Sequence, residues 1–118
     1  MTVEEIEKYC MSKKGVEFDY QADWEATRGR IHEKMFILIG ENKEKKPIVS
    51  LKCEPMLAEA YRREYNDVIP GYYLNKTHWN SIYYTEGNVP DEVLKDMIDI
   101  SYKIILDGLP KKVKETYI

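Results

Sequence analysis

Met35-Phe36-Ile37-Leu38-Ile39 is the most apolar run of the chain, and the fold is built outward from it. The run is short and rich in Ile and Phe, which favours a buried strand over a helix. Six polar or charged residues, 41–46, follow it and predict a loop. Residues 48–53, Ile-Val-Ser-Leu-Lys-Cys, predict the next strand. The two runs together indicate an antiparallel hairpin at the centre of a sheet.

Further strands are predicted on both sides of this hairpin. Residues 16–20 alternate apolar and acidic side chains, as a half-buried strand does. Residues 26–31 are a weaker strand candidate, joined to the hairpin by a tight turn at His32-Glu33. These segments predict an antiparallel meander with short connections. After the Pro70-Gly71 turn signature, residues 78–84 predict one more strand.

Four segments with helical spacing flank the strands. Residues 2–12 begin with Thr2 and Glu5, which are spaced as a capping box. Residues 90–107 carry a continuous apolar stripe, and a last short helix covers residues 110–117. The remaining helix begins at Pro55, and its spacing predicts four inward-facing residues: Met56, Leu57, Ala60 and Tyr61. The pattern predicts a single α+β domain over residues 1–118, an antiparallel sheet with helices on one face.

The composition is that of a globular domain and excludes several classes of protein. The 118 residues are 43% hydrophobic and 33% charged, which is typical of a folded chain. No apolar run approaches the roughly 20 residues of a membrane span, and the acidic N-terminus lacks an apolar secretory core. Cys10 and Cys53 form no CxxC motif, so we expect two free thiols in a reduced, cytoplasmic setting.

The charge is nearly balanced overall but unevenly distributed. The net charge of -3 argues against a protein that coats nucleic acid nonspecifically. Residues 28–52 carry seven cations and three anions, whereas residues 86–107 carry two cations and six anions. This split indicates either one basic and one acidic face or two solvated surfaces that have no partner.

Four segments carry a resemblance to a known family. They are Asp23-Trp24-Glu25-Ala26-Thr27, Lys34-Met35-Phe36, Ser50-Leu51-Lys52 and residues 68–80, within which Leu74-Asn75-Lys76-Thr77-His78-Trp79 is the most specific part. Their order and spacing, and the chain length, resemble the MmcQ/YjbR family of small bacterial proteins. The resemblance implies a frataxin-like (CyaY-like) α+β sandwich in a double-wing arrangement. It also implies a DNA-binding role, and it carries over no catalytic residues.

The cations of the predicted hairpins are the candidate DNA contacts. Arg28 and Arg30 are two residues apart, so on a strand they point to the same side, where they could meet adjacent phosphates. The loop at residues 43–46 would form a second basic tip. The full set of candidate nucleic-acid-binding residues is Arg28, Arg30, Lys34, Lys52 and Lys76. The alternative is an ordinary charged hairpin with local ion pairs, because carboxylates occupy the same tips.

A ligand- or protein-binding module is the second interpretation, placed in the tyrosine-rich region 72–84. Lysine, histidine and indole side chains close together can bind an anionic or aromatic group by charge and stacking. The candidate residues are Tyr73, Asn75, Lys76, His78 and Trp79. This interpretation predicts a pocket or an apolar patch in that region. In the alternative, Trp79 anchors the core and Asn75 shapes the preceding turn.

The sequence gives no pattern for an enzyme, a metal site or a cofactor. His32 and His78 have no second His or Cys at i+3 or i+4, and no P-loop, glycine fingerprint or nucleophile elbow is present. The outer face of the helix at 90–107 is acidic, but a solvated helix face explains it better than a metal site. We therefore expect a non-catalytic protein whose partner is DNA, another protein or a small ligand, with no membrane contact.

Overall fold

The computed structural model describes residues 1–117. Within this range the helices are α1 (Val3–Met11), α2 (Pro55–Glu64), α3 (Asp91–Asp107) and α4 (Lys111–Glu115). The strands are β1 (Val16–Gln21), β2 (Ala26–Ile31), β3 (Lys34–Glu41), β4 (Pro47–Lys52), β5 (Val68–Pro70) and β6 (Trp79–Ile82). The capping box at the start of α1 is present, with Thr2 and Glu5 each bonded to the other's backbone N–H. Among residues 1–117, no helix combines the length and the apolar character that a membrane crossing requires.

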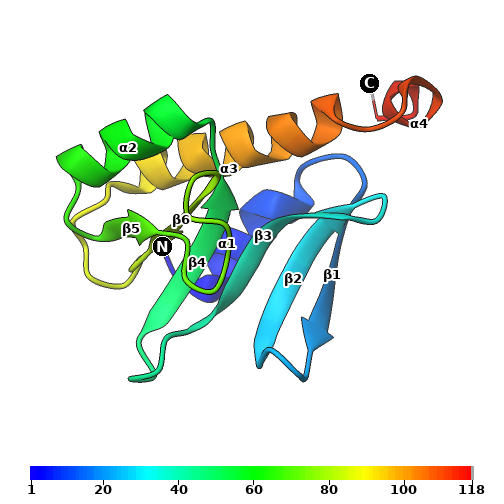
Figure 1. Ribbon diagram of the computed structural model, residues 1–118. Coiled ribbons are helices and arrows are strands. Elements are labelled where there is room, and N and C mark those ends of the chain that lie inside the picture. The colour runs from blue at the N-terminus through cyan, green and yellow to red at the C-terminus, as the bar shows by residue number, and fades with distance from the viewer. Residues whose placement is uncertain (118) are drawn as a thin grey trace.

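The strands form one antiparallel sheet in the order β1-β2-β3-β4-β6-β5 (Figure 1). Strands β1 to β4 form the predicted meander, each pairing with the next along the chain. The chain then crosses over through α2, and β6 pairs with both β4 and β5. The three-residue strand β5 therefore becomes one edge of the sheet. The predicted α+β fold is confirmed.

The core lies between the sheet and its helices. α3 packs against β3 and β4, α2 packs against β5 and β6, and α1 contacts β1. Figure 1 shows α2 and α3 running alongside one another, with α1 behind the strands. Ile39, Val49 and Ile82 are in register across three strands and share one buried cluster with Leu94 and Ile98 of α3. The helices thus cover one face of the sheet, and the other face is open to loops and solvent.

The predicted inward face of α2 is partly wrong. Met56 is 77% and Leu57 36% exposed, whereas Ala58 is fully buried, and the tyrosines at 61 and 65 pack against the core. The small Ala58 side chain lets the helix approach β6 closely, where the Asn80 amide donates to the Ala58 carbonyl at 3.1 Å. The buried stripe is therefore shifted from the predicted one, and the longer side chain of Met56 is left in solvent.

Candidate functional site

One row of residues crosses the open face of the sheet from the edge strand β1 to β6. The register aligns Asp19, Arg28, Leu38, Ser50 and Ser81 on neighbouring strands. Side chains directly opposite one another in register share a face, so the row changes from charged at β1 to apolar at β3 and to hydroxyl at β4 and β6. On the side that the helices do not cover, the row is therefore charged at β1 and β2, whereas its hydroxyl end at Ser50 and Ser81 is buried.

The loop between β5 and β6, residues 71–78, covers part of this face. The Ser81 hydroxyl accepts a hydrogen bond from the Tyr72 N–H at 2.9 Å and lies 2.6 Å from the Ser50 hydroxyl. Lys76 Nζ donates to the Gly71 carbonyl at 2.8 Å, which closes the loop on itself. Asn75 Oδ1 accepts hydrogen bonds from the backbone N–H groups of Thr77 and His78. These bonds hold the loop over β4 and β6.

A groove of about 590 Å³ remains beside this loop. Its floor is the open face of β2, β3 and β4, with the side chains of Leu38, Ile48 and Ser50 among its lining. One wall is the turn at residues 23–25, and the other is the loop at residues 72–74. The hairpin loop between β3 and β4 closes one end. The volume is in the usual range for a small-ligand site, roughly 300–1,000 Å³.

Aromatic side chains border the groove and are unusually exposed. Trp24 is 54% exposed and Tyr73 is 77% exposed, although large aromatic residues usually bury most of their surface. The Tyr72 and Tyr73 rings meet edge to face with centroids 4.5 Å apart. The Tyr72 hydroxyl accepts a hydrogen bond from the Lys43 N–H at 2.9 Å. This bond ties the β5–β6 loop to the β3–β4 hairpin and fixes one side of the groove.

Backbone strain is concentrated at the same place. Within residues 1–117, four non-glycine residues have a positive φ, and three of them line the groove: Glu25 at 50°, Lys45 at 66° and Tyr73 at 58°. A side chain in the left-handed region costs energy, and residues of this kind cluster at binding and active sites. The strain therefore marks the groove independently of its volume.

The hairpin loop is ordered by its own hydrogen bonds. Asn42 Oδ1 accepts from the backbone N–H groups of Glu44 and Lys46. Lys46 forms an ion pair with Glu86 and lies over the Tyr83 ring, and the hydrogen bond to Glu86 raises the pKa of its ammonium group. Among the described residues, Lys43 and Lys45 form no ion pair. Two free ammonium groups thus stand at this end of the groove.

Two of the five predicted DNA contacts are engaged in ion pairs. Arg28 donates from Nε and Nη2 to both carboxylate oxygens of Asp19, each at 3.0 Å. Arg30 Nε donates to Asp19 Oδ2 at 2.8 Å, and its Nη2 lies 3.6 Å from Glu17. The predicted shared side of the two arginines is confirmed, but the neighbouring strand β1 presents carboxylates to the same side. Arg28 and Arg30 therefore match the alternative of local ion pairs.

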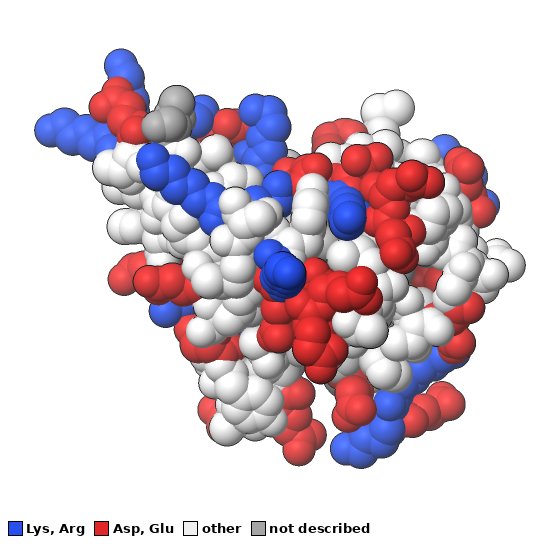
Figure 2. Space-filling view, turned by 180° about the vertical axis from the view of Figure 1, so that it is seen from behind, with Lys and Arg blue, Asp and Glu red and all other residues white. Residues whose placement is uncertain are grey.

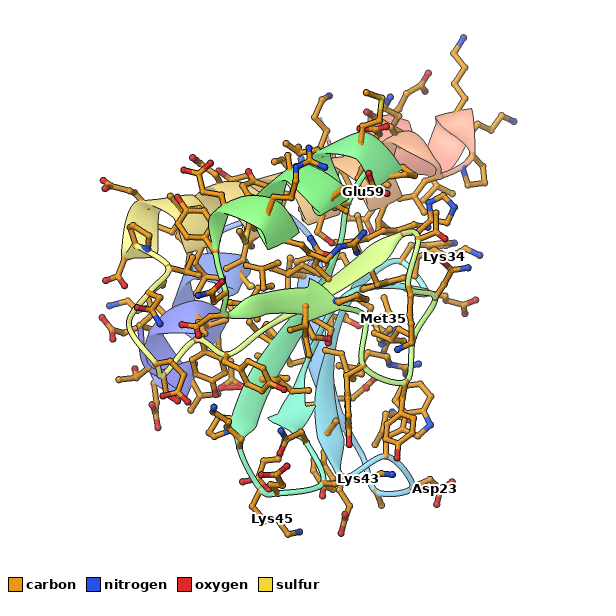
Figure 3. All side chains as sticks on the ribbon, turned by 60° about the vertical axis from the view of Figure 1, so that its left-hand side comes forward. Asp23, Lys34, Met35, Lys43, Lys45 and Glu59 are labelled. Atoms are coloured by element: carbon orange, nitrogen blue, oxygen red, sulfur yellow. The ribbon has the colours of Figure 1, made fainter. Side chains whose placement is uncertain are left out.

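The other three predicted contacts lie at one end of the sheet. Lys34 begins β3 and Lys52 ends β4, and Lys76 lies in the loop that leads into β6, so antiparallel pairing places all three at the same end. The loop at residues 43–46 lies at the opposite end of β3, whose eight residues span about 26 Å. Figure 3 shows this separation between Lys34 and the pair Lys43 and Lys45. The two predicted basic tips do not meet.

The Asp19 cluster predicts how the stability depends on pH. Hydrogen bonds from Arg28, Arg30 and Gln21 hold the pKa of Asp19 well below its ordinary value of 3.8. Because the pKa is lowered in the folded state, the cluster stabilises the fold above about pH 4 and loses this effect as the pH falls. We expect the wild type to lose more stability than Asp19→Asn between about pH 5 and pH 2.

Urea unfolding midpoints measured across that pH range check this expectation. Asp23→Asn is the matched control, because within residues 1–117 the Asp23 carboxylate forms no ion pair. Its pH dependence should follow that of the wild type. Equal pH dependence of the wild type and Asp19→Asn would show that the cluster does not stabilise the fold.

The predicted ligand-binding residues are only partly brought together. Tyr73 lines the groove, whereas Asn75, Lys76, His78 and Trp79 are absent from its described lining. Asn75 shapes the turn before β6, as the alternative to ligand binding proposed. Sequence reasoning missed Trp24, Lys43 and Lys45 as members of one site, because they come from turns far apart in the chain. One signal in the sequence could have indicated the site. Trp24 stands between Asp23 and Glu25 in a predicted turn, where a large aromatic side chain is expected to be exposed.

The face of the molecule that the helices cover, opposite the groove, carries many acidic residues. Acidic side chains gather in the middle of the face shown in Figure 2. On α3, Asp91 pairs with the N-terminal ammonium group at 3.1 Å, and Asp99 accepts from the Tyr9 hydroxyl at 2.7 Å. Burial and the hydrogen bond to Asp99 raise the pKa of Tyr9 to about 12. Across residues 1–117, no group of three His, Cys, Asp or Glu side chains is placed to hold a metal ion.

Comparison with known proteins places the fold and the family. A crystal structure of a protein from Deinococcus radiodurans superposes with a TM-score of 0.87 over 98% of this chain and 87% of that one, at 24% identity. A Pseudomonas syringae protein gives a TM-score of 0.78 over 89% of this chain and 99% of that one, at 19% identity. At these identities the likeness shows the fold alone.

Sequence relatives are closer. The uncharacterized protein YjbR of Escherichia coli is 37% identical over 98% of this chain and 96% of its own length. The uncharacterized protein YbdF of the same species is 34% identical over 70% of this chain and 66% of its length. The family model described as YjbR matches residues 11–104. The chain belongs to the YjbR family.

Proposed function

We propose that this chain is a non-catalytic binding protein whose ligand lies in the groove on the open face of the sheet. The observation that carries the proposal is the coincidence of three features at one place. The groove has ligand-sized volume, it is bordered by Trp24 and Tyr73 with most of their surface exposed, and it is lined by three strained residues. Exposed aromatic side chains around a concave site are typical of binding surfaces.

The chemistry of the lining supports binding rather than catalysis. The described lining contains no His or Cys, and its floor is mostly apolar. The Ser50 hydroxyl on the floor is close to Ser81 and has no His beside it among the described residues, so no base is placed to activate it. A small molecule or a segment of another protein fits such a lining.

Nucleic-acid binding is the second candidate, and the end of the sheet that carries Lys34, Lys52 and Lys76 supports it. Within residues 1–117 none of these three lysines forms an ion pair with a carboxylate. Lysines on three adjacent segments can contact successive phosphates and release counterions. The engagement of Arg28 and Arg30 with Asp19 weakens this candidate relative to the groove.

One NMR experiment tests both candidates. The ¹⁵N-labelled protein is titrated with the aromatic anion 8-anilinonaphthalene-1-sulfonate and, separately, with a short DNA duplex at low salt. Groove binding predicts that the aromatic probe shifts the signals of Trp24, Leu38 and Tyr73. Binding at the lysine end predicts that the duplex shifts the signals of Lys34 and Lys52. Glu59 on α2 lies away from the groove in Figure 3 and serves as the internal reference.

Two variants sharpen the groove test. Trp24→Ala should weaken binding of the aromatic probe by about tenfold, because one aromatic contact is typically worth a factor of this order. Tyr20→Ala is the matched control, since Tyr20 is 63% exposed but lies outside the described lining of the groove. The absence of any shift at Trp24, Leu38 and Tyr73 would overturn the proposal.

A further inference from the structure

We propose that the groove takes a nucleoside phosphate, with the base against Trp24 and Tyr73 and the phosphate at Lys43 and Lys45. This inference rests on the proposed function, because it names the class of ligand for the same groove. The argument comes from three kinds of side chain that line the groove in a fixed arrangement: aromatic rings, unpaired ammonium groups and unpaired carboxylates.

The aromatic rings favour a flat ligand. The turn that carries Trp24 is closed by two backbone hydrogen bonds, from Trp24 N to the Gln21 carbonyl and from Glu25 N to the Ala22 carbonyl. Tyr73 is held against the Tyr72 ring, whose hydroxyl is fixed by the Lys43 N–H. The backbone that carries Trp24 and the ring of Tyr73 are therefore positioned before a ligand arrives. Stacking on such rings is available to every nucleobase, because each has a π-face.

The ammonium groups favour an anion on that ligand. Lys43 and Lys45 are two residues apart in a loop that Asn42 orders, and neither forms an ion pair within residues 1–117. Lys46, the last residue of the same loop, already forms an ion pair with Glu86. Figure 3 shows Asp23, Lys43 and Lys45 at the same end of the molecule. Lysine binds phosphate as a point charge, and two such charges suit a phosphate group.

Two carboxylates beside Trp24 make a simple aromatic anion a poorer ligand for the groove than a molecule that also carries hydrogen-bond donors. Asp23 and Glu25 flank Trp24 and, within residues 1–117, form no ion pair, so they would repel a ligand that is anionic at that wall. Beside Trp24 the two carboxylates instead favour a ligand that presents hydrogen-bond donors. In dinucleotide sites an acidic residue binds the hydroxyl groups of the ribose in this way. Glu41, the last residue of β3, also lines the groove, at the end that carries the β3–β4 hairpin loop.

A nucleoside phosphate combines all three properties in one molecule. It has a flat base, hydrogen-bond donors on the sugar and the base, and an anion at one end. Two sources carry this chemistry, a free mononucleotide and one unit of a single strand. A duplex does not offer it, because its bases are stacked on one another and their faces are not available.

Titration of the full chain tests the inference, with shifts at Trp24, Leu38 and Tyr73 followed by NMR. AMP, GMP, CMP and UMP are compared with adenosine and with inorganic phosphate. At least one mononucleotide should bind about tenfold or more tightly than adenosine or phosphate alone, since stacking and charge act together. Lys43→Gln/Lys45→Gln should weaken nucleotide binding by about tenfold and leave adenosine binding unchanged.

Lys34→Gln is the matched control, because Lys34 lies at the opposite end of β3 and its replacement should leave nucleotide binding unchanged.

A single-stranded decanucleotide distinguishes a free mononucleotide from one unit of a strand as the ligand. Tighter binding of the strand than of the mononucleotide, lost in the same double lysine variant, supports a strand, and equal or weaker binding supports a free nucleotide. If the aromatic sulfonate occupies the groove but no mononucleotide or strand binds at millimolar concentration, this inference is overturned and the proposed function stands. If neither binds, both fail.

Discussion

Replacing Ser101 with alanine should lower the free energy of unfolding by about 2–4 kcal/mol, because a buried backbone carbonyl and a part-buried backbone N–H lose their partner. Ser101 is a fully buried residue of α3. Its hydroxyl donates to the Phe36 carbonyl at 2.5 Å and accepts from the Lys52 N–H at 2.9 Å. The β3–β4 pairing ends at Ile37 and Leu51, so these two groups lie just beyond the ladder and depend on the helix.

Urea unfolding at neutral pH measures this effect. Ser12→Ala is the matched control, because its hydroxyl also bonds to a backbone carbonyl, that of Tyr9, but at an exposed helix end. We expect Ser12→Ala to change the free energy of unfolding by less than about 1 kcal/mol. The groove lies on the other face of the sheet, so Ser101→Ala should bind the aromatic sulfonate as the wild type does. A loss for Ser101→Ala no larger than that for Ser12→Ala would contradict the role given to this hydroxyl.

The sequence predicts the meander because its information is local. Alternation over residues 16–20, the apolar run at 35–39 and the short loops between them specify neighbours that are also adjacent in the chain. The place of β6 between β4 and β5 is not local, since β5 has three residues and a helix separates it from β4. The face of α2 was misjudged for a related reason. The helical spacing of apolar residues in α2 fits more than one buried face, and the contact with β6 determines that Ala58 lies on the buried one.

The sequence analysis expected aromatic and lysine side chains around a ligand site, but it did not predict where the groove lies. An aromatic and lysine surface was expected near Tyr73, and the structure instead joins Tyr73 to two turns that lie about 30 and 50 residues away in the sequence. The ion pairs of Arg28 and Arg30 were closer to being predictable. Glu17 and Asp19 alternate on the preceding strand, and an antiparallel hairpin with a short turn places them opposite the two arginines. No comparable rule for neighbouring segments predicts the groove, because its lining comes from turns that are far apart in the sequence.

Replacing Tyr73 with glycine should separate stability from binding. Tyr73 is 77% exposed and has a φ of 58°, a region that glycine occupies without strain. Relief of this strain, about 1–2 kcal/mol, is opposed by the greater entropy of an unfolded glycine and by loss of the ring contact with Tyr72. We expect the free energy of unfolding to stay the same or to rise by up to about 1 kcal/mol. Binding of the aromatic sulfonate should weaken by about 10- to 100-fold.

The comparison with His32→Gly identifies the cause of these changes. His32 has a φ of 56° but lies at the β2–β3 turn, outside the described lining of the groove, and its N–H bond to the Tyr117 hydroxyl survives the substitution. His32→Gly should therefore leave the fold at least as stable and bind the aromatic sulfonate like the wild type. A Tyr73→Gly protein that is no less stable but binds weakly shows that the strained tyrosine serves the ligand. If instead Tyr73→Gly destabilises the chain by more than about 1 kcal/mol and binds normally, the ring supports the loop and the strain has no binding role.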